Sequence, residues 1–291
     1  MSKWPNLFIV GTPKAGTSSL YVYLSNIPGI YMSSVKEPNY FSIKTIPEQS
    51  RIKPIRDRTK YLSLFKKVKN EKIFGEASTS YLSDPDAAKL IHDVSPDARI
   101  IISLRDPVER TLSYYFMLLR NGLMKGSFNE EVQKSLKVVG VYNTRSLNLE
   151  AGLYSGDVQR YLNIFGPTHV KILIFEEFVK EPKKIMKEVL SFLGIDIELN
   201  DFEDEIYNKY GVPRGTISQF LLKSFKVRRI AEKIIPTSSR RVIKEKFLLK
   251  NEQKPKMSEI DRDVLTKFYR EDVKKLEKIL GRKLPWKNFQ S

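Results

Sequence analysis

The chain has no cysteine and only two histidines, and both shortages restrict its chemistry. Without cysteine there is no disulfide framework, no thiolate metal site and no cysteine nucleophile. Two histidines are too few for a histidine-rich metal centre, and neither His92 nor His169 lies in a sequence typical of a Ser-His-Asp triad. We therefore expect chemistry that needs no metal ion and no nucleophilic thiol.

Long apolar runs are also missing. No stretch reaches the roughly 18 apolar residues that span a bilayer, and the first residues lead into a strand-like segment without the apolar core of a signal peptide. The lack of cysteine fits a reducing compartment. These absences predict a cytoplasmic protein, attached to a membrane at most at its surface.

Positive charge is abundant: 51 Lys and Arg stand against 34 Asp and Glu, which gives a net charge of +17. Such an excess attracts anionic ligands, nucleic acid or acidic lipid. The excess is concentrated late in the chain, because residues 212–256 contain 13 Lys and Arg but only 3 Asp and Glu. The charge predicts the sign of a partner and not its identity.

Short apolar runs alternate with segments of helical periodicity along the 291 residues. The expected strands cover residues 7–10, 72–74, 99–104 and 169–175, and the expected helices cover residues 17–24, 86–94, 157–165 and 182–193. This alternation predicts an α/β fold in which helices cover both faces of a parallel sheet. We expect a single domain over residues 1–291, with a basic helical or lid region at about 207–256. A closing helix at about 258–280 carries an apolar stripe that starts at Ile260.

The loop from Gly11 to Ser19 joins the first expected strand to the first expected helix. Backbone N–H groups converge at such a position and the helix dipole favours an anion, so a phosphate or sulfate fits there. The two glycines resemble those of a Walker A loop, but Lys14 comes before the second glycine and Thr17 occupies the slot of the Walker lysine. This spacing disfavours an ordinary NTPase. The alternative is a glycine-rich turn that only connects strand to helix.

A second candidate anion site begins where the expected strand 99–104 ends. Arg105 follows that strand and is expected to project from the carboxyl edge of the sheet, where ligands bind in open α/β folds. Its guanidinium fork suits a phosphate monoester, and Ser113 in the next helix offers a hydroxyl donor. The alternative is an arginine that pairs locally with Asp106 or Glu109.

Taken together, these two segments resemble the sulfotransferases that use 3′-phosphoadenosine 5′-phosphosulfate as donor. Residues 12–18 look like that family's 5′-phosphosulfate loop, and Arg105 with Ser113 looks like its 3′-phosphate site. Similarity to the heparan sulfate and related bacterial branch continues through residues 36–41, 75–81, 152–154, 175–178 and 256–286. The resemblance implies a P-loop-like three-layer fold with a central, mainly parallel sheet flanked by helices. It also implies sulfuryl transfer to an acceptor hydroxyl of a glycan or glycolipid.

The resemblance assigns roles to individual residues. Donor binding is expected from Pro13, Lys14, Ala15, Gly16, Thr17, Ser18, Arg105, Ser113, Tyr207 and Arg214. Lys14 is expected to neutralise the charge that develops on the departing nucleotide, 3′-phosphoadenosine 5′-phosphate, without a metal ion. Glu37 matches the glutamate that takes the acceptor's proton as general base, and residues 207–215 look like a lid over the nucleotide.

One departure from the heparan-type pattern concerns residues 75–81. Ala77 stands where those enzymes commonly carry a second lysine, so a two-lysine contact with the transferred group is not expected. Glu76, Ser78 and Ser80 are left as candidate contacts for donor or acceptor. Glu76 is also the second candidate for the general base.

Two other functions stay open from the sequence. A P-loop kinase or nucleotide-binding protein shares the strand-loop-helix pattern, but the apolar run 100–104 ends in Arg105 and not in the aspartate of a Walker B strand. A nucleic-acid-binding protein could use the basic segment 212–256, which carries no recognised motif. We expect a nucleotide sulfate donor and a hydroxylated acceptor, such as an anionic glycan, a lipid-linked sugar or a small metabolite, and no stable complex with nucleic acid.

Overall fold

The computed structural model describes residues 4–42, 53–121, 123–139, 146–199, 212–213, 249–250 and 256–290. Its centre is a five-stranded sheet made of β1 (Leu7–Gly11), β2 (Ile30–Met32), β3 (Ile73–Ala77), β4 (Arg99–Leu104) and β5 (Val170–Ile174). The strand order is β2-β3-β1-β4-β5, and every neighbouring pair is parallel. The parallel sheet expected from the sequence is confirmed, and β2 is a short strand that the sequence analysis did not predict.

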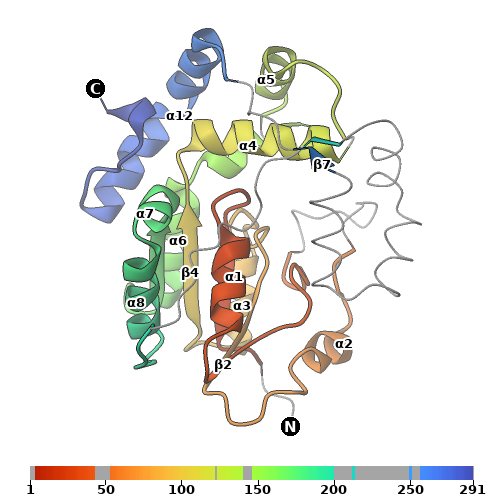
Figure 1. Cartoon of the computed structure of the whole chain (residues 1–291), viewed down its shortest axis with the longest axis vertical. Helices are drawn as coiled ribbons and strands as arrows, with labels where there is room; N and C mark the ends of the chain where they lie inside the picture. The colour runs from red at the N-terminus through yellow and green to blue at the C-terminus, as the bar shows by residue number, and fades with distance from the viewer. Residues whose placement is uncertain are drawn as a thin grey trace.

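Helices cover both faces of this sheet (Figure 1). They are α1 (Thr17–Ser25), α2 (Arg58–Ser63), α3 (Ala87–Val94), α4 (Pro107–Arg120), α5 (Phe128–Leu136), α6 (Ser155–Phe165), α7 (Phe175–Lys180), α8 (Pro182–Phe192) and α12 (Glu259–Leu280). The 3-10 turns η1 (Leu149–Gly152) and η3 (Lys287–Phe289) and the antiparallel pair β6 (Val212–Pro213) and β7 (Leu249–Lys250) are the other described elements. The result is the three-layer α/β architecture expected from the sequence.

The two buried faces of β1 explain the three layers. Side chains alternate between the faces of a strand, so Leu7 and Ile9 point to one side and Phe8 and Val10 to the other. Leu7 and Ile9 belong to the core under α1, α7 and α8, whereas Phe8 and Val10 belong to the core under α3, α6 and α12. The continuous apolar run 7–10 therefore fills two cores at once, as a fully buried parallel strand does.

The closing helix forms as expected, and Val273 and Leu276 of the predicted stripe are buried, but the stripe does not start at Ile260. Ile260 is 72% exposed, and the buried positions include Leu265 and Tyr269. The reason lies at the helix start, where the Ser258 hydroxyl caps the helix and donates to the Asp261 carboxylate at 2.6 Å. This contact places Asp261 on the inner face, so Ile260 faces outward.

Cap residues set the start of the helix that follows β4. Asp106 accepts the backbone N–H groups of Val108 and Glu109, and Pro107 occupies the first turn of α4. Only Arg105 and Asp106 separate β4 from α4. Arg105 is therefore held at the carboxyl edge of the sheet between two regular elements.

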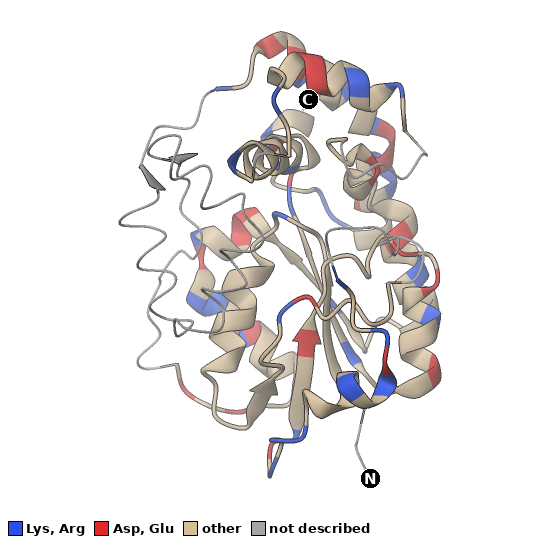
Figure 2. Cartoon of the chain, turned by 90° about the vertical axis from the view of Figure 1, so that its right-hand side faces the viewer, with Lys and Arg blue, Asp and Glu red and all other residues tan. Residues whose placement is uncertain are grey.

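Charges of both signs are interspersed over the described helices on the face shown in Figure 2. The basic helical or lid region expected at about 207–256 lies outside the described residues, apart from β6, β7 and Lys256. Across the described part of the chain, no helix has the length and apolar character that crossing a membrane requires.

Candidate functional site

The loop after β1 is bound to the end of β4. The Thr12 N–H donates to the Ser103 carbonyl at 2.7 Å, and the Ser103 hydroxyl donates to the Ala15 carbonyl at 2.5 Å. Lys14 and Gly16 both have positive φ, at 75° and 79°. The loop is thus a compact turn at the carboxyl edge of the two central strands, where ligands bind in folds of this class.

The N-terminus of α1 presents backbone N–H groups that bond to no acceptor within the described part of the chain. The N–H groups of Ser19 and Leu20 return to the Gly16 carbonyl, and no side chain caps the helix. Among the described residues, no acceptor is present for the N–H groups of Gly16, Thr17 and Ser18. These groups and the helix dipole together favour an anion at this position.

Glycine is required at position 16 for two reasons. Its φ of 79° is in the left-handed region, and a Cβ there would lie 2.8 Å from the Phe175 ring. Phe175 is the first residue of α7, directly after β5. The ring thus packs against the anion-binding loop.

Arg105 lies between this loop and Phe175. Its Nη1 donates to the Lys14 carbonyl at 3.1 Å, and the guanidinium carbon lies 4.6 Å from the centroid of the Phe175 ring. The Nε atom is buried and has no hydrogen-bond partner among the described residues. Burial lowers the pKa of this arginine, opposed mainly by the nearby Glu176 carboxylate. A desolvated guanidinium with an unused donor is suited to binding an anion.

The local ion pair considered from the sequence does not form within the described part of the chain. Asp106 caps α4, and Glu109 pairs with Arg262 of α12 at 3.0 Å. Ser113 is half-buried in α4, and no described residue hydrogen-bonds to its hydroxyl. The structure brings Arg105 to the loop, and no hydrogen bond joins it to Ser113 among the described residues.

Glu37 follows β2 and meets the end of β3, where its N–H donates to the Ala77 carbonyl at 2.9 Å. The Thr79 N–H donates to Oε2 at 2.9 Å, and the Thr79 hydroxyl donates to Oε1 at 3.1 Å. The Lys36 ammonium lies 2.9 Å from Oε1. The carboxylate is therefore fixed by three donors, yet its side chain is 34% exposed and can be reached from solvent.

Glu76 is not open to a ligand, contrary to the role considered for it from the sequence. It is fully buried, and its carboxyl accepts hydrogen bonds from Tyr61 at 2.8 Å, Tyr81 at 2.7 Å and Ser78 at 2.6 Å. The Ser78 hydroxyl in turn accepts the N–H of Asn39 at 3.0 Å. Glu76 and Ser78 thus support the turn that carries Thr79, and Ser80 donates to the Asn39 side chain at 2.7 Å.

The buried carboxyl of Glu76 has a consequence for stability. Burial raises its pKa from the usual 4.5 to about 7. Between these values the folded protein keeps a proton that the unfolded chain has released. The free energy of unfolding should then fall as pH rises through this window, by at most about 1.4 kcal/mol per pH unit.

Glu76→Gln should make stability less dependent on pH between about 4.5 and 7, because the amide has no proton to lose in this range. Urea unfolding of wild type and variant at several pH values measures the difference, which we expect to reach on the order of 1–3 kcal/mol. Glu259→Gln, at an exposed position in α12, is the control and should run parallel to wild type. Parallel curves for Glu76→Gln as well would contradict the prediction.

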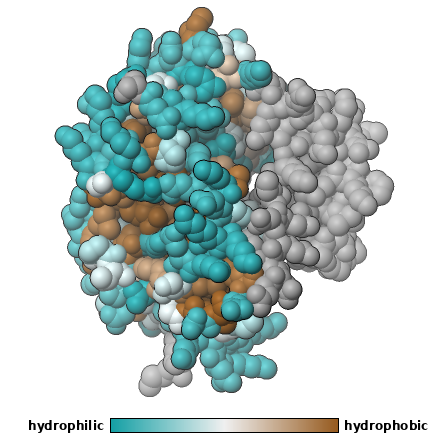
Figure 3. Space-filling model, turned by 60° about the vertical axis from the view of Figure 1, so that its left-hand side comes forward, coloured by the Kyte–Doolittle hydropathy of each residue, from teal (hydrophilic) through white to brown (hydrophobic). Residues whose placement is uncertain are grey.

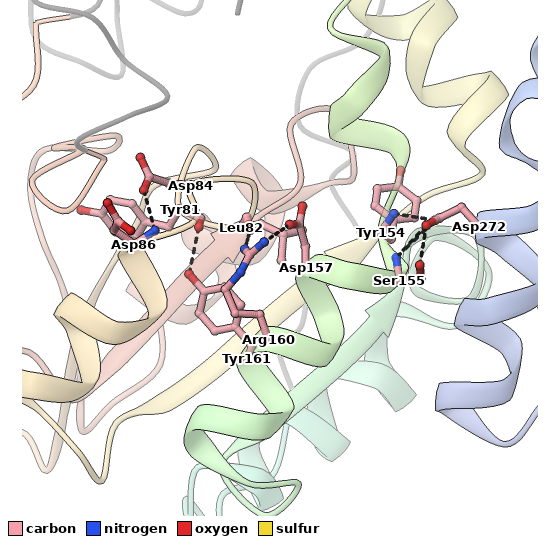
Figure 4. Close-up of polar contacts among 10 residues, drawn as sticks. All are labelled: Tyr81, Leu82, Asp84, Asp86, Tyr154, Ser155, Asp157, Arg160, Tyr161 and Asp272. Atoms are coloured by element: carbon pink, nitrogen blue, oxygen red, sulfur yellow. Dashed lines mark hydrogen bonds and ion pairs between the residues drawn. The ribbon is translucent and has the colours of Figure 1, made fainter. Parts of the chain in front are cut away.

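Polar contacts attach the loop after β3 to α6 (Figure 4). The Tyr161 hydroxyl donates to the Tyr81 carbonyl at 3.0 Å. Arg160 donates to the Leu82 carbonyl at 3.2 Å and pairs with Asp157 at 2.8 Å. The turn that holds Glu37 is therefore anchored to the helical layer beneath it.

The sequence analysis gave no role to Thr79 or Phe175, which the structure places against Glu37 and Arg105. Two signals pointed to them: each lies in a segment that resembles the family, and each comes shortly after the carboxyl end of a strand. Tyr207 and Arg214, predicted to bind the donor, lie outside the described residues. Within the described ranges no group of His, Asp and Glu side chains is arranged to hold a metal ion.

Comparison with known proteins identifies similar sequences. A family model described as "Sulfotransferase domain" matches residues 5–279. Human carbohydrate sulfotransferase 15 is 28% identical over 245 residues, which cover 66% of this chain and 44% of that protein. Human heparan sulfate glucosamine 3-O-sulfotransferase 6 is 27% identical over 199 residues, which cover 68% of this chain and 55% of that protein. The chain thus spans about half the length of these curated relatives.

Solved structures are similar over the full chain. A sulfotransferase from Alicyclobacillus acidocaldarius is 32% identical, with a TM-score of 0.73 and 97% of each chain covered. The sulfotransferase domain from the curacin biosynthetic pathway has a TM-score of 0.50 at 15% identity, covering 97% of this chain and 100% of that one, and is similar in fold alone.

Proposed function

Because this chain belongs to the sulfotransferase family, we propose that it moves a sulfuryl group from 3′-phosphoadenosine 5′-phosphosulfate to a hydroxyl of a glycan or glycolipid. The observation that carries the proposal is the pairing of two anion-binding features at one sheet edge. One is the α1 N-terminus with its unused N–H groups, and the other is Arg105 with its buried, unpartnered Nε. A nucleotide with phosphates at both its 5′ and 3′ positions needs two such features.

The donor, when bound, supplies the activated sulfuryl group. The N–H groups of Gly16, Thr17 and Ser18 are assigned to its 5′-phosphate, and Arg105 is assigned to its 3′-phosphate. The orphaned Nε of Arg105 fits this role, because a buried donor without an acceptor is costly until an anion arrives. Ser113, Tyr207 and Arg214 stay predicted contacts of the same nucleotide.

Lys14 is the residue assigned to charge neutralisation. It lies in the loop that binds the 5′-phosphate, and its carbonyl accepts a hydrogen bond from Arg105. An ammonium in this loop stabilises negative charge as it builds on the departing nucleotide, which is the usual contribution of a fixed cation in group transfer of this kind.

Glu37 is assigned the role of general base, which takes the proton of the acceptor hydroxyl. Oε1 already receives the Lys36 ammonium and the Thr79 hydroxyl, whereas Oε2 receives only the Thr79 N–H. A carboxylate oxygen can accept about two hydrogen bonds, so the free capacity lies on Oε2. We assign the proton taken from the acceptor hydroxyl to this atom, as general-base catalysis requires.

The relatives' names support the proposed acceptor class, since both human proteins are named as sulfotransferases of carbohydrate or heparan sulfate. Incubation of the protein with labelled donor and a panel of glycan, lipid and phenolic acceptors tests this. A single domain over residues 1–291 and a cytoplasmic location stay predictions from the sequence.

The donor assignment predicts that 3′-phosphoadenosine 5′-phosphate binds about 10–100-fold more tightly than adenosine 5′-monophosphate, because hydrogen bonds to a charged group contribute about 1.5–3 kcal/mol. Calorimetric titration of both nucleotides measures the ratio. Equal affinities would remove the donor assignment. Preference for ATP that depends on magnesium would instead favour a kinase.

A further inference from the structure

A C-terminal segment, residues 284–289, contacts two carboxylates, one at the start of α7 and one at the β4–α4 junction. Trp286 is fully buried, and its Nε1 donates to Glu176 Oε2 at 3.0 Å. The Asn288 amide donates to Asp106 Oδ2 at 2.7 Å. Glu176 follows Phe175 and Asp106 follows Arg105, so these contacts are made to the direct chain neighbours of the stacked pair Arg105 and Phe175.

Glu176 connects the two contacts. Its Oε1 accepts the backbone N–H of Asp106 at 3.1 Å while its Oε2 accepts Trp286. The peptide group that follows Arg105 is therefore joined through one carboxylate to the C-terminal segment. Asp106 itself is held by the helix cap and by Asn288, so its side chain cannot turn toward Arg105 without losing both.

The carbonyl of Arg105, in the same peptide group, is also hydrogen-bonded. It accepts the Tyr154 hydroxyl at 2.8 Å. Backbone N–H groups of Tyr154 and Ser155 donate to Asp272 of α12, at 2.6 Å for Tyr154 (Figure 4). Both polar groups of the Arg105–Asp106 peptide are thus hydrogen-bonded to side chains. Tyr154, which holds the carbonyl, contacts α12, and Glu176, which holds the N–H, contacts the C-terminal segment.

The outer side of the C-terminal segment is open. A hollow of about 1090 Å³ lies between this segment, β5, α7 and α8, and includes Trp286, Lys287 and Asn288 in its lining. Figure 3 looks onto this side and shows apolar surface framed by hydrophilic residues. Trp286 is held by its burial in the core beside Tyr154 as well as by its hydrogen bond, whereas half-buried Asn288 is held mainly by its hydrogen bonds.

We propose that Trp286 and Asn288, acting through Glu176 and Asp106, are positioning residues that orient Arg105 for the donor's 3′-phosphate. The inference rests on the proposed function and adds residues that are 110 and 182 positions away from their partners in the sequence. Orientation matters because a guanidinium binds phosphate through a planar fork, whose hydrogen bonds weaken steeply when misdirected.

Two variants test the proposal. Asn288→Ala removes two hydrogen bonds of a half-buried side chain, the one donated to Asp106 and the one accepted from Arg262. Glu176→Gln leaves one acceptor oxygen for two donors, so a hydrogen bond to Asp106 or to Trp286 must be lost. We expect each variant to lower affinity for 3′-phosphoadenosine 5′-phosphate about fivefold, as loss of about 1 kcal/mol implies, and to leave adenosine 5′-monophosphate binding unchanged.

Glu176→Gln distinguishes a role of Glu176 in orienting Arg105 from a purely electrostatic effect of its charge. Removing a carboxylate near Arg105 would by itself tighten the binding of an anion, whereas misorientation of Arg105 weakens it. Arg282→Ala is the matched control. Arg282 lies just before the C-terminal segment and pairs with Glu177 at 3.0 Å, without a hydrogen bond to Glu176 or Asp106. It should bind both nucleotides like wild type.

Calorimetric titration of both nucleotides, with thermal unfolding as a check on folding, decides the matter. A reduced preference for the 3′-phosphate in both variants, with wild-type behaviour in Arg282→Ala, supports the proposal. Unchanged preference, tighter binding in Glu176→Gln, or equal loss for both nucleotides overturns it. A wild-type protein without any preference overturns the donor assignment first, and this inference with it.

Discussion

Glutamine at position 37 is expected to lower kcat by about 10²–10⁴-fold, the usual contribution of a general base, while donor affinity stays within about twofold of wild type. The amide keeps the shape of the side chain but cannot take a proton. It also presents an amino group to the donors Lys36 and Thr79 or toward the acceptor. Steady-state kinetics with an acceptor from the panel, together with calorimetric titration of the nucleotide, measures both effects.

A suitable control for this variant is Glu71→Gln, which makes the same chemical change before β3, at the opposite end of the strand from Glu37. It should have wild-type kinetics. Near-wild-type turnover in Glu37→Gln would move the role of base away from Glu37. Glu76 would not inherit that role easily, because its carboxyl is fully buried and occupied by three hydroxyl donors.

Lys14→Ala is expected to lower both the affinity for the donor and kcat, unlike Glu37→Gln, which lowers kcat alone. The Lys14 ammonium is assigned to the nucleotide both in the bound state and as charge develops on it. Loss of a single charge-stabilising group typically lowers kcat by about 10²–10³-fold, and loss of ground-state binding adds to this in kcat/KM. Titration of 3′-phosphoadenosine 5′-phosphate and kinetics at saturating donor separate the two effects.

Lys89→Ala removes the same charge from an exposed pair with Asp93 on α3 and serves as the control. It should change neither quantity, since an exposed ion pair contributes little and does not touch the loop. Should Lys14→Ala weaken donor binding while kcat at saturation is retained, Lys14 would act in binding alone.

Several parts of the fold follow from local sequence. The strands 7–10 and 99–104 and the helices 17–24 and 86–94 were predicted within a few residues of their observed bounds. Each is a continuous apolar run or an amphipathic period bounded by glycine, proline or a cap residue. The short strand β2 was missed because three residues carry no detectable period.

Predictions that depended on which face of an element is buried were less successful. The stripe assigned to α12 began at Ile260, yet Asp261 lies inward because it accepts hydrogen bonds from Ser258 and from Asn129. Glu76 was considered as a possible ligand contact, yet it lies in the middle of a buried strand among two tyrosines. Hydrophobicity alone does not reveal a buried polar group whose partners come from other elements.

By itself, the sequence determined the turn that holds Lys14, the left-handed glycine before α1 and the position of Arg105 between a strand and a capped helix. These features depend on backbone conformations and caps within a few residues, which local sequence specifies. Only the tertiary structure decided that Thr79 holds Glu37 across 42 positions and that Asn288 reaches Asp106 across 182. Such contacts depend on strand order and on the packing of distant helices, because a hydrogen bond needs its atoms within about 3 Å whatever their separation along the chain.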